Sequence, residues 1–126
     1  MNKLVLDFND VKHENLSIIG GEAYHLTKLL KKNFPVPQGF IVTTNCFQSF
    51  LEQNFLYFLH RSLTKNLSLK DTFYIASNLR HKVIKGKIPK KLKKIIAGKI
   101  DKFNFDSVSV RSSATVEDGH NGSSND

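Results

Sequence analysis

Large apolar residues recur at helical spacing in four segments of this 126-residue sequence, and this periodicity constrains the fold more than any other feature. Prolines and glycines stand between the segments, where they favour the end of a helix over its continuation. The spacing predicts four helices, which cover approximately residues 22–33, 45–63, 69–85 and 89–100. Ser68, followed three residues later by Asp71, resembles a capping box that would begin the third of these helices.

Three shorter segments have the β-branched content or the alternation that is typical of strands, and they cover residues 3–8, 40–43 and 105–111. Residues 16–21 are also expected to be extended and to end in a two-glycine turn. Together these patterns predict an α+β fold with a small sheet and about four helices.

Length and composition fit one soluble, folded domain, since hydrophobic residues make up 40% of the chain. The longest apolar run, residues 55–59, is far shorter than the roughly 20 residues of a membrane-spanning helix, so we expect no membrane association. The first residues reach Asp7 before any apolar stretch of signal-peptide length, and the expected location is therefore cytoplasmic. Cys46 is the single cysteine, which excludes a disulfide within the chain.

The formal net charge is +8, and the excess is concentrated between Arg80 and Lys102, where nine lysines stand against one acid, Asp101. One interpretation is a surface that binds nucleic acid or another polyanion. The other is a solvated, lysine-rich helix face, which we favour because no aromatic or arginine pattern typical of nucleic-acid modules interleaves with the lysines.

Two places could bind an anion. Gly20 and Gly21 precede a helix, where glycine permits close backbone approach to a ligand and the first N–H groups favour negative charge, although such a pair is more often an ordinary turn. Arg111 stands at the end of a predicted strand and is followed by three hydroxyl side chains, a set that suits phosphate oxygens but also occurs in solvated loops. These hydroxyl residues are Ser112, Ser113 and Thr115.

The segment from Val110 to Asp118, Val-Arg-Ser-Ser-Ala-Thr-Val-Glu-Asp, resembles the signature of the nucleotide-binding domain of the pyruvate phosphate dikinase and phosphoenolpyruvate synthase family, which includes rifampicin phosphotransferase. Upstream, Gly20-Gly21 and the proline-rich residues 34–44 are similar to two further motifs of that family, in the same order. The resemblance runs from about Leu16 to Asp118.

The resemblance implies the N-terminal lobe of an ATP-grasp domain over residues 1–118, followed by a polar tail, residues 119–126, that we expect to be disordered. Enzymes of this family are ATP-dependent kinases that transfer a phosphoryl group to a histidine and then to pyruvate or a related acceptor. By this resemblance, ATP phosphates would contact Gly20 and Gly21 on one side, and on the other side they would contact the residues Arg111, Ser112, Ser113 and Thr115.

Two departures limit what this chain can do. The family's lysine after the glycine pair is replaced here by Glu22, and one unit-charge pair at ~4 Å is worth about 4 kcal/mol at an effective dielectric constant near 20. The family's second lobe, its acidic Mg²⁺ ligands and its histidine domain have no counterpart in this sequence, so no catalytic residue is assigned. We expect a truncated or split phosphotransferase that binds ATP and is inactive alone. Docking onto a partner chain that carries the second lobe and the histidine domain is one expected fate, and a decayed fragment without a ligand is another. A basic polyanion-binding module is the alternative.

Overall fold

The computed structural model describes residues 3–115 of the protein. Its sheet consists of two short antiparallel strands, β1 (Val5–Asp7) and β2 (Phe40–Val42), in which Leu6 pairs with Ile41. Within the described residues, the helices number six, and they are α1 (Leu16–Ile19), α2 (Gly21–Lys31), α3 (Thr44–Gln53), α4 (Tyr57–Ser62), α5 (Leu69–Lys85) and α6 (Lys90–Phe103). Two 3₁₀ turns, η1 (Phe8–Asp10) and η2 (His13–Asn15), link β1 to α1.

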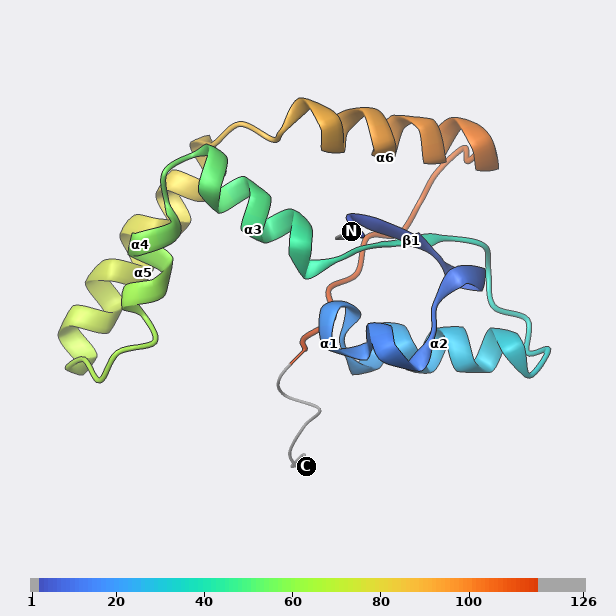
Figure 1. The fold of residues 1–126 in the computed structure, drawn as a ribbon, viewed down its shortest axis with the longest axis horizontal. Coiled ribbons are helices and arrows are strands. Elements are labelled where there is room, and N and C mark those ends of the chain that lie inside the picture. The colour runs from blue at the N-terminus through green and yellow to red at the C-terminus, as the bar shows by residue number, and fades with distance from the viewer. Residues whose placement is uncertain (1–2, 116–126) are drawn as a thin grey trace.

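The described residues pack around two apolar cores. The first joins the sheet to α1 and α2, and its buried residues are Leu6, Val11, Ile19 and Ala23. The second lies among α3, α4 and α5, and its buried residues are Leu51, Leu56 and Leu79. Figure 1 shows α2 on one side of the sheet, α6 on the other, and α3–α5 as a group that extends away from both.

The helix α6 is attached to the sheet by charge. Lys99 Nζ lies 2.9 Å from one carboxylate oxygen of Asp7, the last residue of β1, and Lys102 Nζ lies 3.3 Å from the other. Burial by itself would raise the pKa of Asp7, but hydrogen bonds and charge from the two lysines outweigh it and leave that pKa below its usual value.

The prediction of an α+β fold with a small sheet is confirmed, whereas residues 3–115 contain six helices rather than about four. The segment expected to form one helix over 45–63 is divided into α3 and α4. At the break, Asn54 Nδ2 donates to the carbonyl oxygens of Phe50 and Lys87, at 2.8 and 3.0 Å, which ends α3 and ties it to the linker before α6. Phe55 follows with a φ of 58° and turns the chain into α4.

Two predictions of extended structure are wrong. Residues 16–19 form α1 instead, because Ile19 is buried in the first core and Gly20 N–H donates to Leu16 O at 3.0 Å. Residues 105–111 form no strand, and Val110 in this segment is 92% exposed. In the described sheet β1 and β2 pair only with each other, so this segment has no ladder of hydrogen bonds to a strand, and alternation alone cannot provide one.

No helix among residues 3–115 has the length and apolar character needed to cross a bilayer. The predicted polar tail, residues 119–126, lies outside the described residues.

Candidate functional site

The turn between α1 and α2 is built around Gly20. Its φ of 83° and ψ of 166° belong to a region that side chains with a Cβ rarely adopt. A Cβ at this position would also lie 2.5 Å from both Ala114 O and Ser113 Oγ. Gly20 is therefore in close contact with a distant segment of the same chain, and the approach of ATP phosphates to the glycine turn stays a prediction.

Segment 113–114 binds the first turn of α2 through its oxygen atoms. Gly21 N–H donates to Ala114 O at 3.4 Å, and Ala23 N–H donates to Ser113 Oγ at 3.2 Å. The N-terminal amides of a helix carry partial positive charge, which these oxygens partly satisfy. Gly20, Gly21 and Ala23 are buried, so the contact forms part of the packed interior near α1.

Arg111 is brought to the same turn. Its Nε lies 3.5 Å from Glu22 Oε2, and Glu22 is in the first turn of α2, next to Gly21. Both side chains are largely in contact with solvent, at 72% exposure for Arg111 and 52% for Glu22. A guanidinium and a two-glycine turn that are 90 residues apart in the sequence are thus neighbours in the fold.

The other predicted ligands continue the same segment. Ser112 is exposed, while Ser113 and Thr115 are half-buried. A hydroxyl that accepts a hydrogen bond, as Ser113 Oγ does from Ala23 N–H, still has its own proton to donate to a second acceptor. Glu117 and Asp118 of the motif lie outside the described residues.

The site contains one full positive charge and one full negative charge close together, from Arg111 and Glu22. Lys28, on the same helix, is six residues beyond position 22, about 9 Å further along the axis, and its Nζ lies over the Tyr24 ring at 5.7 Å from the ring centre. Among the described residues, no group of three or more His, Cys, Asp or Glu side chains is arranged to hold a metal ion. Chemically, the site offers a guanidinium fork, hydroxyl protons and the positive end of a helix.

Reasoning from the sequence missed two participants. Ala114 acts through its carbonyl oxygen, for which residue type gives no signal. Glu22 was recognised as a departure from the family pattern but not as the ion-pair partner of Arg111, which opposite charge alone could have suggested. A groove of about 600 Å³ elsewhere, lined in part by Asn45, Phe55 and Phe58, includes none of the predicted ligands.

Comparison with known proteins identifies relatives of this chain. The family described as "Pyruvate phosphate dikinase, AMP/ATP-binding domain" matches residues 16–124, which include both the glycine turn and Arg111. Rifampicin phosphotransferase of Bacillus subtilis is 36% identical over 124 residues, which cover 94% of this chain and 14% of that protein. Phosphoenolpyruvate synthase of Aeropyrum pernix is 30% identical over 126 residues, which cover 92% of this chain and 15% of that protein. The chain therefore spans about one seventh of the length of these relatives.

Proposed function

Because this chain belongs to the family of the pyruvate phosphate dikinase AMP/ATP-binding domain, we propose that its residues 1–118 form the N-terminal lobe of an ATP-grasp nucleotide-binding domain. The observation that carries the proposal is the neighbourhood of Arg111 and the Gly20–Gly21 turn, which the 3.5 Å contact to Glu22 establishes. We assign this neighbourhood to the phosphate end of ATP.

The chemistry of the assigned residues supports a phosphate ligand. An arginine binds phosphate oxygens through two parallel N–H groups, and a nearby helix N-terminus favours the same negative charge. The hydroxyls of Ser112, Ser113 and Thr115 are in the segment that carries Arg111 and would donate further hydrogen bonds. The glycine turn fits this assignment because it lets segment 113–114 pack against α2. This packing holds Arg111, two residues before the segment, close to the turn.

The whole enzyme would be a phosphotransferase, because one of the relatives is a rifampicin phosphotransferase and another is a phosphoenolpyruvate synthase. We propose phosphoryl transfer from ATP to a histidine and then to pyruvate or a related acceptor. The second lobe, the Mg²⁺ ligands and the histidine domain would come from polypeptide beyond these 126 residues, either as a continuation or as a partner chain. The 126 residues alone should not catalyse transfer, because the phosphates must be positioned and their charge stabilised from both lobes.

The test is an ATP-dependent thermal shift of the 126-residue chain, measured with Mg²⁺ present. ATP is expected to raise the Tm of the wild type and to raise the Tm of Arg111→Ala much less, because a ligand that binds only the native state stabilises it according to its affinity. Arg80→Ala is the matched control, since Arg80 is an exposed arginine on α5. An equal Tm rise in Arg111→Ala and the wild type would contradict the assignment.

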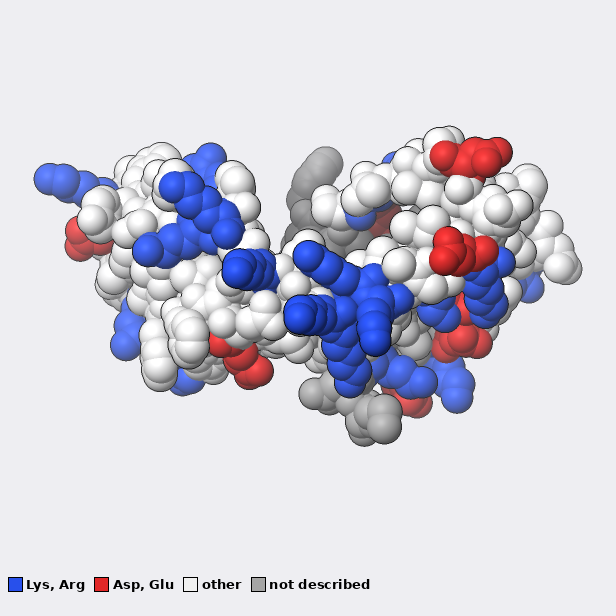
Figure 2. Space-filling view, turned by 90° about the horizontal axis from the view of Figure 1, so that it is seen from above, with Lys and Arg blue, Asp and Glu red and all other residues white. Residues whose placement is uncertain are grey.

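A second candidate function rests on the lysines of α6. Figure 2 shows Lys and Arg side chains gathered on the face of the molecule seen from above, where α6 lies, and the exposed residues there include Lys90, Lys91, Lys93 and Lys94. This surface would bind nucleic acid or another polyanion. In that case, replacing these four lysines with Gln should weaken binding to a defined RNA and reduce its dependence on salt, whereas Arg111→Ala should leave it unchanged.

A further inference from the structure

We propose that Glu22 is an internal competitor for the anion that Arg111 binds, so that the residue at position 22 sets the nucleotide affinity of this site. The inference rests on the proposed function, because it concerns the same guanidinium and the same ligand. It adds an affinity-determining residue and predicts which nucleotides this chain discriminates against.

The geometry places an oxygen atom of the chain itself at two backbone N–H groups of the turn and at one nitrogen of the Arg111 guanidinium. Ala114 O accepts from Gly21 N–H and Ser113 Oγ accepts from Ala23 N–H, while the Glu22 carboxylate faces Arg111 Nε at 3.5 Å. A carboxylate and a phosphate present the same kind of oxygen acceptor to a guanidinium. Glu22 therefore occupies the position toward Arg111 that a phosphate oxygen would take.

The ion pair is the part of this arrangement that a ligand can displace. Gly21 and Ala23 are buried, whereas the side chains of Glu22 and Arg111 are 52% and 72% exposed. Exposed ion pairs cost little to open, so a phosphate group can replace the carboxylate without disturbing the packing of segment 113–114. Arg111 stays near the turn because two of the next three residues are hydrogen-bonded to α2.

Once displaced, the carboxylate still affects the ligand. It remains on the first turn of α2, close to the guanidinium, and its charge repels each negative charge that the nucleotide brings. The repulsion grows with the charge of the phosphate tail. Wild-type protein should therefore discriminate against ATP relative to AMP, and neutralising position 22 should reduce that discrimination.

The experiment measures binding of ATP, AMP and inorganic tripolyphosphate to the 126-residue chain by titration calorimetry at low salt without Mg²⁺. Glu22→Gln removes the charge with little change in shape and should tighten ATP and tripolyphosphate binding about five-fold and AMP binding about two-fold. Glu22→Lys should tighten ATP binding roughly twenty-fold, because attraction replaces repulsion. Glu52→Gln, an exposed glutamate on α3, is the matched control and should change none of these affinities.

A double-mutant cycle distinguishes competition at Arg111 from a general charge effect. In an Arg111→Ala background, the increase in ATP affinity caused by Glu22→Gln should be less than half of the increase seen with Arg111 present, because the ion pair between Glu22 and Arg111 no longer exists. If Glu22→Gln binds ATP as the wild type does while Arg111→Ala binds more weakly, the Glu22 inference is overturned and the ATP site stands. If the folded wild type, Glu22→Gln and Glu22→Lys all fail to bind ATP and tripolyphosphate, the ATP site itself is refuted and the inference falls with it.

Discussion

The carboxylate of Asp7 lies 2.9 Å from Lys99 Nζ, and this ion pair joins the end of β1 to the penultimate turn of α6. The Asp7 side chain is only 12% exposed and also contacts Lys102. Leu92 is the single buried residue that α6 contributes among the described residues. The position of α6 over the sheet therefore depends on charge more than the position of α2, which contributes Gly21, Ala23 and Thr27 to the interior.

Asp7→Asn should lower the free energy of unfolding by about 1–2 kcal/mol, because it leaves Lys99 without the charge it pairs with. Urea unfolding at pH 7 measures the change. Asp10→Asn is the control, since Asp10 is exposed in η1 and should change stability by less than about 0.5 kcal/mol. Equal stabilities for Asp7→Asn and the wild type would mean that the pair contributes nothing to holding α6.

The ionisation of Asp7 makes the stability of the protein depend on pH in a definite direction. The pKa of Asp7 is lowered in the folded state, so folding favours its ionised form. The resulting stability is fully present above the carboxyl's usual pKa, about 4, and is lost as the pH falls through the lower, folded-state value. The difference in stability between the wild type and Asp7→Asn should therefore be largest at pH 7 and shrink as the pH falls below about 4. A difference that persists unchanged to acid pH would argue against the ion pair.

The parts of the fold that the sequence predicts well are those decided locally. α5 begins where Ser68 was expected to cap it, and Asp71 N–H donates to Ser68 Oγ at 3.1 Å. α6 follows Pro89, and as the apolar spacing predicts, its first four lysines are exposed, namely Lys90, Lys91, Lys93 and Lys94. Helical periodicity, a capping residue and a proline act within one or two turns of chain, so no distant partner is needed to interpret them.

The parts that could not be predicted depend on distant contacts. Asn54 ends α3 because its side chain reaches the backbone of Lys87, and nothing near Asn54 in the sequence indicates that partner. The alternation over 105–111 predicts a strand, but a strand also needs a neighbour with free backbone groups. For the site, motif resemblance pointed to Arg111 and the glycine turn, whereas the contact from Ala114 is made by a carbonyl that every residue type carries.

Gly20→Ala adds only a methyl group, yet it should disrupt the site strongly. The φ of 83° is unfavourable for alanine, and the new Cβ would meet Ala114 O at 2.5 Å. We expect a loss of about 2 kcal/mol or more in stability, together with faster hydrogen exchange at the Gly21 and Ala23 amides as segment 113–114 is displaced. Hydrogen exchange followed by NMR reports both amides in the same sample.

Gly98→Ala is the matched control for this substitution. Gly98 is inside α6, and a Cβ there would meet nothing within 4 Å. Alanine in a helix interior is better than glycine by roughly 0.5–1 kcal/mol, so this variant should be more stable than the wild type. If both glycine variants lost stability equally, the special geometry of Gly20 would be excluded as the cause.

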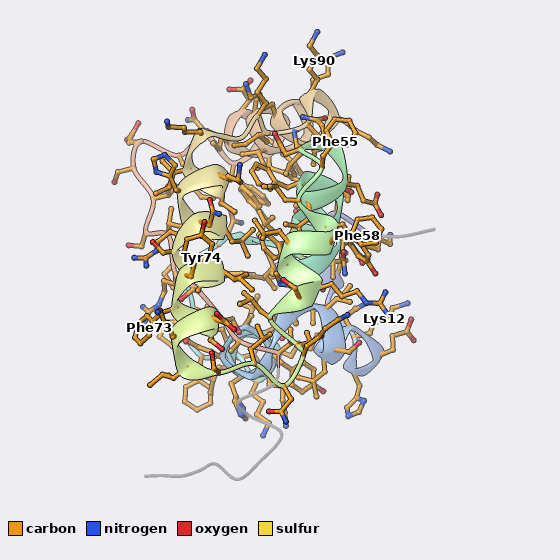
Figure 3. The ribbon with its side chains drawn as sticks, turned by 90° about the vertical axis from the view of Figure 1, so that its left-hand side faces the viewer. Lys12, Phe55, Phe58, Phe73, Tyr74 and Lys90 are labelled. Carbon is orange, nitrogen blue, oxygen red and sulfur yellow. The ribbon has the colours of Figure 1, made fainter. Side chains whose placement is uncertain are left out.

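Phe55 combines an unfavourable backbone with an exposed ring, and replacing it should not destabilise the chain. Its φ is 58° and its side chain is 93% exposed, and Figure 3 shows it on the outside of the helical group near the end of α3. Asparagine tolerates left-handed backbone better than phenylalanine, so Phe55→Asn should be neutral or stabilising by up to about 1 kcal/mol. Leu56→Ala, at the buried neighbour, should cost about 2–4 kcal/mol. If urea unfolding showed that Phe55→Asn loses more than about 1 kcal/mol of unfolding free energy, the Phe55 ring would have to be buried in solution. The α3–α4 junction would then pack more tightly than the exposure of Phe55 indicates.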